Sequence, residues 1–576
     1  AVWYQIFPER FHNGDSSNDP KVEDIKGSWP HDVNSPYKTS NWTGDWYAYQ
    51  EWEDPAKDLN YHIQRRRYGG DLQGVLDKLD YLQDLGINAI YFNPLFEAPS
   101  LHKYDGATYH HIDKNFGPDP GKDKKIIASE VPEDPGTWKL TTADSLFLKL
   151  VQECHGRGIK VIIDGVFNHV GLNFWAFKDI KKHQQDSEFA SWFSVKSWDD
   201  PATPEDEFDY EGWYGVKELP ELREDENGIV SGPRKYIFSA VRRWMDPNGD
   251  GNPADGIDGW RLDVAEMVKK PFWRDFRKFV RGINPEAYLV GEVWWEDWQN
   301  NKMFNARLWL EGDIFDAVMN YRWAEEVIHF FVDEKNKITA SQFDARLKAL
   351  RNDYPKEVNY VLMNLLDSHD TDRLASQIVN PNDVYDHRDH PRENSDYEIR
   401  KPTDDEIRLQ KLIALFQMTY VGAPMIYYGD EAGMWGADDP DCRKPMLWPE
   451  LTYEPEASHP LGGQRPVDQN RFNQDLFNHY KRLIHTRNTH AALQIGKIET
   501  LLTDDDNDVF AFRRFDDTQT LIIAINNSED QQSISVPVPQ IEQKDSWTDI
   551  LTQKSYEVRE ESLNLLLPGT SGVILK

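Results

Sequence analysis

Eight apolar, strand-length runs alternate with amphipathic helical patterns, and this alternation limits the possible fold more than any other feature of the chain. The runs cover residues 2–11, 88–96, 160–168, 259–265, 288–294, 315–320, 360–369 and 424–431. Helical candidates between them cover residues 72–85, 142–157, 271–283 and 407–420. Such alternation is typical of a parallel α/β fold. Eight units favour a closed (β/α)8 TIM barrel over an open sheet.

Two other stretches break the alternation and predict further domains in this chain of 576 residues. From residue 170 to 240, after the third run, the periodicity is lost in an aromatic, acidic and turn-rich stretch, which predicts an inserted lobe. From residue 491 to 576, short alternating runs predict an antiparallel β-sandwich domain. The barrel then comprises residues 1–169 and 241–490. Residues 117–141, rich in Pro and Lys, predict a loop after the second strand.

Charge and cysteine content exclude several classes of protein. With 99 acidic and 65 basic residues the net charge is -34, which argues against nucleic acid or an anionic membrane surface as a partner. The only two cysteines exclude a disulfide framework and a cysteine-rich metal site. No apolar run reaches the length of a membrane span. The acidity suits a saline or extracellular setting, so we expect an extracytoplasmic (secreted or periplasmic) protein, with a cytoplasmic location as the alternative.

Polar residues gather where the predicted strands end. They are Asp164, Asn168 and His169 after the third run, Asp263 after the fourth, Glu292 after the fifth, and His369 and Asp370 after the seventh. The carboxyl ends of barrel strands form the face that carries the chemistry in this type of fold. The pattern therefore predicts one convergent site.

Arg261 and Asp263 stand two residues apart, so on an extended strand both side chains point to the same face. A guanidinium beside a carboxylate favours the ionised acid and lowers its pKa, as a carboxylate nucleophile requires. Asp263 is thus the candidate nucleophile. A buried structural ion pair at a strand end is the alternative.

Two further acids are candidates for proton transfer and charge stabilisation. Glu292 is followed by Trp294 and Trp295, and desolvation among indoles favours the protonated carboxyl that a general acid needs. The alternative is a simple strand-end carboxylate. Asp370 beside His369 suits hydrogen bonding to sugar hydroxyls and stabilisation of positive charge on a reacting sugar, or else a structural loop cap. The 21 tryptophans, 25 tyrosines and 27 phenylalanines suit sugar binding as well as core packing.

Four segments in order resemble the motifs of the alpha-amylase family of glycoside hydrolases. They are residues 164–169 (DGVFNH), 259–263 (GWRLD), 291–294 (GEVW) and 366–370 (LDSHD). Residues 3–11, 68–72, 102–105 and 422–431 resemble the neopullulanase and cyclomaltodextrinase branch. The resemblance extends from the first residues to about residue 448.

The resemblance implies a role for each motif residue. Asp263 would be the nucleophile, Glu292 the acid/base and Asp370 the transition-state stabiliser. The sugar-binding residues would be Tyr104, Asp105, His169, Arg261, Trp294, His369 and Arg373. A retaining glycosidase needs its two carboxyl groups about 5 Å apart, which adjacent barrel strands can supply.

We therefore expect a retaining, endo-acting hydrolase of α-1,4-glucosidic bonds in starch-type α-glucans. Cyclomaltodextrinase or 4-α-glucanotransferase activity is the alternative, and a catalytically silent glucan-binding scaffold is the alternative outside enzymes. Glu266 departs from the branch, in which an amide is usual, and leaves the linkage preference open. The N-terminal β domain common in the branch, which helps to build its dimer, does not occur in this sequence, so we expect a monomer.

Two segments rich in hard oxygen ligands suit Ca²⁺. The ligand residues of the first segment are Asn13, Asp15, Asn18 and Asp19, to which the family resemblance adds the Gly69 carbonyl and Asp71. An ordinary polar turn is the alternative for this segment. The second, Asp246, Asn248 and Asp250, repeats acids and amides as an EF-hand loop does, but Ile257 stands where the twelfth-position glutamate is expected. No redox or nucleotide cofactor is expected.

Overall fold

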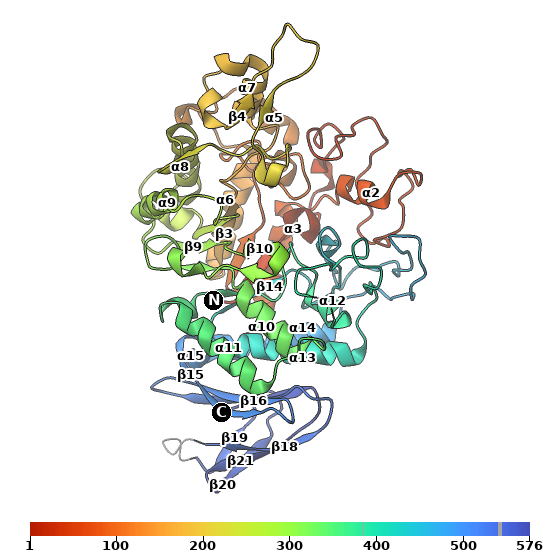
Figure 1. Ribbon diagram of the computed structural model, residues 1–576, viewed down its shortest axis with the longest axis vertical. Helices are drawn as coiled ribbons and strands as arrows, with labels where there is room; N and C mark the ends of the chain where they lie inside the picture. The colour runs from red at the N-terminus through yellow and green to blue at the C-terminus, as the bar shows by residue number, and fades with distance from the viewer. Residues whose placement is uncertain (383, 539–543) are drawn as a thin grey trace. The chain divides into compact units, whose positions relative to one another are not determined.

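A computed structural model describes residues 1–382, 384–538 and 544–576 (Figure 1). These residues form two compact units. Unit 1 consists of Ala1–Tyr4, Tyr81–Ile87 and Met319–Lys576, and unit 2 of Gln5–Asp80 and Asn88–Val318.

Eight strands form one sheet in the order β12-β9-β8-β3-β2-β1-β14-β13. Their bounds are β1 Trp3–Ile6, β2 Ala89–Phe92, β3 Lys160–Gly165, β8 Gly259–Leu262, β9 Tyr288–Gly291, β12 Ala317–Val318, β13 Met363–Asn364 and β14 Ala423–Tyr427. Consecutive strands are neighbours, and a parallel bridge joins Met319, directly after β12, to Met363 of β13. The predicted (β/α)8 TIM barrel is confirmed. Each strand is shorter than the apolar run that predicts it.

The helices follow the apolar spacing of the sequence. Those of unit 2 are α1 Pro8–Phe11, α2 Leu59–Arg65, α3 Leu72–Asp77, α5 Pro120–Ile127, α6 Thr142–Gly156, α7 Trp175–His183, α8 Ser231–Met245 and α9 Lys270–Ile283. In α9, Phe272, Trp273, Phe276 and Val280 are buried, which is the face expected from a 3.6-residue period. Helix α6 begins with a capping box in which Thr141 and Asp144 each accept the other's backbone N–H.

Unit 1 also contains helices that begin with capping boxes. Its helices are α4 Leu79–Leu85, whose first two residues belong to unit 2, α10 Tyr321–Phe331, α11 Ala340–Asp353, α12 Leu374–Val379, α13 Asp404–Thr419, α14 Gln474–Thr489 and α15 Ala491–Ile495. Capping boxes at Thr339 and Thr403 start α11 and α13. The short helix α15 lies inside the stretch for which the sequence predicted strands alone.

The stretch after β3 carries α7 and two small antiparallel pairs, β4 Val195–Ser197 with β5 Asp209–Tyr210, and β6 Glu224–Asp225 with β7 Gly228–Ile229. Helix α8 runs through residue 240, so the boundary predicted there falls inside a helix. The other domain boundaries stay predictions. The loop predicted for residues 117–141 contains helix α5, whose start at Asp119 and Pro120 combines an N-cap acid with a first-turn proline. A further pair, β10 Trp295–Asp297 with β11 Lys302–Met303, follows β9.

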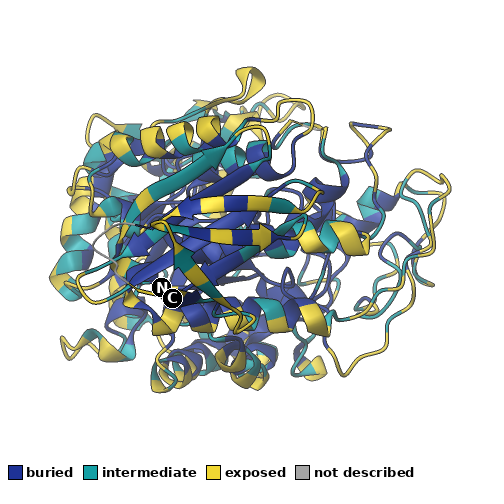
Figure 2. Ribbon diagram, turned by 90° about the horizontal axis from the view of Figure 1, so that it is seen from below, coloured by how far each residue is buried: buried dark blue, intermediate teal, exposed yellow. Residues whose placement is uncertain are grey.

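The C-terminal part of unit 1 is antiparallel, as predicted. One sheet orders β15 Lys497–Asp504, β16 Val509–Phe515, β17 Thr520–Asn526 and β22 Ser571–Leu575. The other orders β18 Gln532–Pro537, β21 Ser562–Leu567, β20 Ser555–Arg559 and β19 Ser546–Thr548. Buried and exposed residues alternate along β21 (Figure 2), and Leu563, Leu565 and Leu567 join the core around Trp547. Period-two burial is what one covered sheet face requires.

Candidate active site

Arg261 is the centre of a group of buried charges in unit 2. It lies on β8 in register with Asp164 on β3, and its side chain is fully buried. Its Nη1 lies 3.1 Å from Asp164 Oδ1 and 2.7 Å from Asp263 Oδ1, and its Nη2 lies 2.7 Å from Glu292 Oε1. One guanidinium therefore joins three carboxylates that follow or end three neighbouring strands.

Asp263 and Glu292 share this guanidinium, which limits their separation. Because each touches a terminal nitrogen of the same rigid planar group, their nearest oxygens lie within about 8 Å of each other. The separation of about 5 Å that a retaining glycosidase uses falls within this limit. Glycine at position 259 helps to bring β8 and β9 together, because a Cβ there would lie 1.9 Å from the Tyr288 carbonyl oxygen.

The residue after Asp263 has a strained backbone that holds Glu292. Val264 has φ of 38°, a left-handed conformation that costs a β-branched residue about 1–3 kcal/mol. Its N–H donates to Glu292 Oε2 at 2.8 Å, and the N–H of Ala265 donates to the Glu292 carbonyl oxygen at 3.0 Å. Both oxygens of the Glu292 carboxyl are thus engaged, one by Arg261 and one by Val264.

The balance of charge around Asp263 differs from the sequence prediction. Burial raises the pKa of Asp263 well above its ordinary value, and Glu292 and Asp164 add to the rise, whereas Arg261 opposes it. Arg261 lowers the pKa of Asp263, as predicted, but burial outweighs this effect, and the strand pattern does not reveal how deeply the group is buried. One cation among three acids also leaves a net negative charge that favours retention of a proton.

Two tyrosine hydroxyls complete the surroundings of Asp164. Tyr91 donates to Asp164 Oδ2 at 2.7 Å and Tyr104 donates to the same oxygen at 3.0 Å. The Tyr104 ring also lies against His102, with centroids 5.8 Å apart. Tyr104 is therefore held at both its hydroxyl and its ring, and the predicted stacking of Tyr104 on a sugar stays a prediction.

His169 and Asp105 lie in the loops of unit 2. Burial lowers the pKa of His169 to about 3, so its imidazole is neutral, and its ring centroid lies 5.6 Å from that of Trp213. Asp105 accepts a hydrogen bond from the Ser100 hydroxyl, and burial raises the pKa of Asp105 to about 6. The predicted contact of Asp105 with a sugar stays a prediction.

Glu266 and Trp294 flank the group of charges along the chain. Burial raises the pKa of Glu266 to about 8, and the nearby charge of Glu292 adds to the rise. Among the described residues, no hydrogen-bond donor reaches Glu266 Oε2. The Trp294 ring stacks on Trp295 with centroids 5.5 Å apart. From the sequence, Glu266 was noted only as a departure from the family pattern, and its raised pKa was not predicted.

In unit 1, Asp370 is held by a histidine and an arginine. His369 Nε2 lies 3.1 Å from Asp370 Oδ2, and Arg443 Nη2 lies 3.2 Å from Asp370 Oδ1. Arg443 Nε also donates to the His369 carbonyl oxygen at 2.8 Å. The pairing of His369 with Asp370 was expected from their adjacency. Arg443 carried no motif and stands far from Asp370 in the sequence, so it was missed.

Arg373 makes its contacts with the segment that follows β14. Its side chain is fully buried and its guanidinium donates to Asp430, at 3.0 Å, and to the carbonyl oxygens of Tyr428 and Cys442. Its Cζ also lies 4.4 Å from the Tyr427 ring centroid. Arg373 therefore positions the segment after β14, and its predicted contact with the sugar stays a prediction.

In the first predicted calcium segment, some of the oxygen atoms already accept hydrogen bonds that shape the loop. Both oxygens of Asp71 accept hydrogen bonds, from the N–H groups of Gly14, Asp15 and Gly74 and from the Asn18 amide. Asp15 caps the turn that begins at Ser16. Asp71 and Asp15 thus shape the loop with their oxygens.

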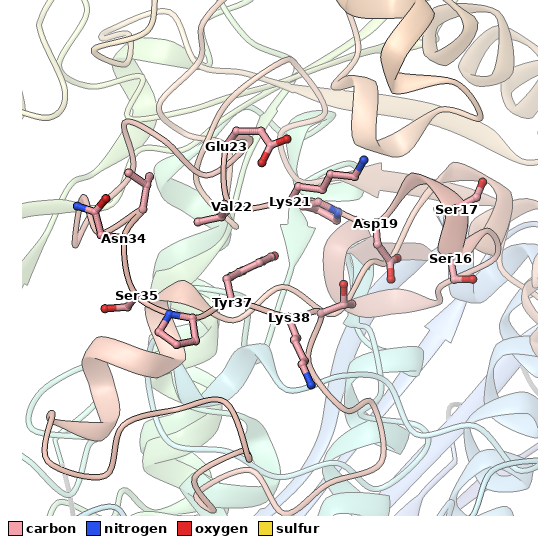
Figure 3. Close-up of a pocket in the computed structure, with 14 residues that line it drawn as sticks. Ser16, Ser17, Asp19, Lys21, Val22, Glu23, Asn34, Ser35, Tyr37 and Lys38 are labelled. Carbon is pink, nitrogen blue, oxygen red and sulfur yellow. The ribbon is translucent and has the colours of Figure 1, made fainter.

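The remaining residues of this segment fit a cation better. Asn18 Oδ1 is buried and accepts no hydrogen bond from the described residues. The Asn13 amide lies 2.8 Å from Asp19 Oδ1, and both groups crowd against Gly69, whose absent Cβ would lie 2.2 Å from Asp19 Oδ1. A cavity of about 760 Å³ opens beside Asp19 (Figure 3). An orphaned amide oxygen beside a carboxylate matches the oxygen ligands that Ca²⁺ prefers.

The second predicted calcium segment forms hydrogen bonds within itself. Asp250 N–H donates to Asn248 Oδ1 at 2.8 Å, and Gly251 N–H donates to Asp246 Oδ2 at 3.2 Å. Asn248 and Asp250 are exposed. A polar turn accounts for these contacts. Asp246, Asn248 and Asp250 offer no buried ligand atom without a hydrogen bond, so the second calcium ion stays a prediction.

Comparison with known proteins decides the family. Residues 5–129 and 141–496 match the alpha-amylase catalytic domain, and residues 496–575 match the alpha-amylase C-terminal domain. The chain belongs to the alpha-amylase family. This alpha-amylase family chain is 36% identical to neopullulanase 2 of Thermoactinomyces vulgaris over 100% of its own length and 77% of that protein. It is 33% identical to an intracellular maltogenic amylase of Bacillus subtilis, covering 95% of itself and 73% of that enzyme.

Solved structures agree with this placement. A cyclomaltodextrinase structure matches the alpha-amylase family chain with a TM-score of 0.70 at 33% identity, covering 100% of this chain and 78% of that one. The predicted resemblance to the neopullulanase and cyclomaltodextrinase branch is confirmed. Across the described ranges, no helix is long and apolar enough to cross a membrane.

Proposed function

We propose that this family member is a retaining, endo-acting hydrolase of α-1,4-glucosidic bonds in starch-type α-glucans. The observation that carries the proposal is the shared guanidinium of Arg261, which holds Asp263 and Glu292 by its two terminal nitrogens. Fixing two carboxyl groups around one reacting bond is the requirement of a double displacement.

In the first step, Asp263 reacts as the ionised carboxylate, the form that Arg261 favours against the effect of burial, and one of its oxygens attacks the anomeric carbon of the sugar. The bond from that carbon to the glycosidic oxygen breaks, and Glu292 gives its proton to the departing oxygen. In the second step, Glu292 takes a proton from water, and the water oxygen displaces Asp263 from the anomeric carbon. The sugar leaves with its original α configuration, and both carboxyl groups return to their starting states.

The remaining acids and the strained loop have supporting roles in this proposal. The N–H of Val264 on Glu292 Oε2 fixes the orientation of the Glu292 carboxyl, whose other oxygen faces Arg261. Asp370 acts as transition-state stabiliser, a role transferred from its family motif, and His369 and Arg443 orient it. His169, neutral because burial lowers its pKa, can hydrogen-bond sugar hydroxyls without adding charge.

Calcium has a structural part in the proposal. Asn13, Asn18, Asp19 and the Gly69 carbonyl would hold it. When bound, Ca²⁺ supplies positive charge that neutralises Asp19 and ties the segment around residue 15 to Gly69. Asn13 would have to present its amide oxygen in place of the nitrogen that now faces Asp19.

Three experiments test the proposal. Proton NMR during hydrolysis of maltoheptaose should show the α anomer of the product first, and initial release of the β anomer would exclude retention. Asp263→Asn should abolish turnover, and unchanged turnover would remove Asp263 as nucleophile. Complete inactivity of the unmutated chain on starch, pullulan and cyclodextrins would favour the scaffold alternative.

The second candidate activity is ring opening of cyclomaltodextrins or transfer of glucan to another sugar, because the same residues serve both reactions and the similar proteins include a cyclomaltodextrinase. Product chromatograms with and without an acceptor sugar separate these activities. A relative is named as an intracellular enzyme, so the extracytoplasmic location predicted from composition lacks support. Fractionation of the source cells tests it.

A further inference from the structure

A second cluster of titratable groups in unit 2 lies outside the candidate active site. His110 and His111 follow β2, and Glu130 follows α5 in the segment of residues 117–141. His111 Nε2 lies 2.7 Å from Glu130 Oε2, and His110 Nε2 lies 3.5 Å from the same oxygen. The three atoms all lie within 4.8 Å of one another. The side chains of His110, His111 and Glu130 are 3%, 0% and 1% exposed, so this convergence is built into the interior.

The outward nitrogen of each imidazole is also fixed. His111 Nδ1 lies 2.8 Å from Asp144 Oδ2, and Arg243 lies 3.0 Å from that same oxygen. His110 Nδ1 lies 2.7 Å from the Tyr236 hydroxyl. A histidine that ligates a metal typically uses its other ring nitrogen to hydrogen-bond a carboxylate or another polar group, which sets its tautomer and orientation. Both histidines meet this requirement.

Packing restrains the histidines further. The indole of Trp138 stacks on His110 with centroids 4.2 Å apart and planes 9° from parallel. Glu130 Oε1 accepts the N–H of Lys139 at 2.5 Å, which leaves Oε2 to face the two imidazoles. These contacts hold His110 and Glu130 in place, so that His110 Nε2 and Glu130 Oε2 face His111 Nε2.

We propose that His110 Nε2, His111 Nε2 and Glu130 Oε2 bind one transition-metal dication, with Zn²⁺ as the best match. Two imidazole nitrogens and one carboxylate oxygen form a common zinc ligand set, with water as the fourth ligand. Bonds of about 2.0–2.1 Å in a tetrahedron place ligand atoms about 3.3 Å apart. The observed separations of 2.7 Å and 3.5 Å lie on either side of this value, so small side-chain shifts suffice.

Metal binding would replace a proton. Without the metal, a proton between His111 and Glu130 joins them; with it, His111 Nε2 gives up this proton and bonds the ion, while Nδ1–H stays with Asp144. The ion would fasten the segment of residues 117–141, through Glu130, to the chain after β2. This role is structural and does not depend on the proposed hydrolase activity.

Metal analysis of the full chain tests the proposal. Protein stripped with chelator is equilibrated with ZnCl₂, passed through a desalting column and analysed for zinc by mass spectrometry. The unmutated chain should retain about one zinc per molecule, and His110→Gln and Glu130→Gln should each lose it. His155→Gln is the matched control, because His155 Nε2 also lies 2.7 Å from a carboxylate, that of Asp258, but in a different part of unit 2. It should keep the zinc.

Thermal unfolding gives a second readout. ZnCl₂ should raise the Tm of the unmutated chain and of His155→Gln, but not that of His110→Gln or Glu130→Gln. Because Ca²⁺ prefers oxygen ligands, any rise in Tm with CaCl₂ should be the same in all four proteins. No retained zinc in the unmutated chain, or equal zinc in all four proteins, would overturn the proposal. If a variant fails to fold, X-ray absorption of the zinc-loaded unmutated chain decides: two imidazoles at the metal support the site, and fewer than two refute it.

Discussion

Replacing Glu266 by glutamine should change the pH dependence of stability in a predictable direction. The pKa of Glu266 is raised from its ordinary 4.5 to about 8, first by burial and then by Glu292. An acid whose pKa is higher in the folded than in the unfolded protein does not lower the free energy of unfolding at a pH below its unfolded-state pKa. Above it, the unfolded chain loses its proton while the folded one keeps it, so stability falls as pH rises from about 4.5 to about 8.

The size of the effect follows from the shift. Each pKa unit corresponds to about 1.4 kcal/mol, so the full shift costs the native state roughly 4–5 kcal/mol at pH 8 and above, as an order of magnitude. Glutamine resembles the neutral acid in shape and does not ionise. Glu266→Gln should therefore match the unmutated chain in Tm near pH 4.5 and exceed it increasingly up to pH 8.

Scanning calorimetry from pH 4.5 to pH 9 measures this difference. Glu205→Gln, at an exposed glutamate of the same unit, is the matched control and should give no such trend. The same variant should retain turnover on maltoheptaose at pH 6, because it reproduces the neutral carboxyl, and should lose activity less steeply above pH 8. A Tm difference that stays constant across this range, or that grows toward acid pH, would refute the raised pKa of Glu266.

Three further perturbations have expected outcomes. Arg261→Lys should lower kcat by at least 100-fold and lower the Tm, because a single ammonium cannot bridge Asp263 and Glu292 and a broken buried ion pair costs about 3–5 kcal/mol; steady-state kinetics and calorimetry measure both. Val264→Gly should raise the Tm or leave it unchanged, because glycine relieves the left-handed backbone strain. Val264→Ala should not raise the Tm. A chelator should lower the Tm, CaCl₂ should restore it, and Asn18→Ala should weaken this response; a Tm insensitive to both reagents would contradict the first calcium site.

Much of the fold could be predicted because it repeats simple periods. The eight apolar runs correspond to the eight barrel strands, and the period-two runs after residue 497 became β15 to β22. The contact between Arg261 and Asp263 also follows from strand geometry, since side chains two residues apart share a face. Helix α5 could have been found from its N-cap Asp119 and first-turn Pro120, a start signal outweighed by the polar composition of residues 117–141.

Other features of the site depend on contacts that no local pattern encodes. Arg443 reaches Asp370 from a segment without a motif, and Glu130 meets His111 only because the segment of residues 117–141 folds back. The net shift at Asp263 depends on how completely water is excluded, which a strand pattern does not reveal. The contacts of Arg373 with Asp430 and with the carbonyl oxygens of Tyr428 and Cys442 also join distant segments, which its motif does not encode.

The proposed double displacement depends most on Asp263 forming a covalent bond to the sugar. The most direct measurement traps that bond: the chain is incubated with an α-glucosyl fluoride that carries a second fluorine on the ring, which slows the second step, and the digested protein is sequenced by mass spectrometry. The expected result is one added sugar on the peptide that contains Asp263, attached to its carboxyl. Attachment to Asp164, Glu266 or Glu292 instead would contradict it.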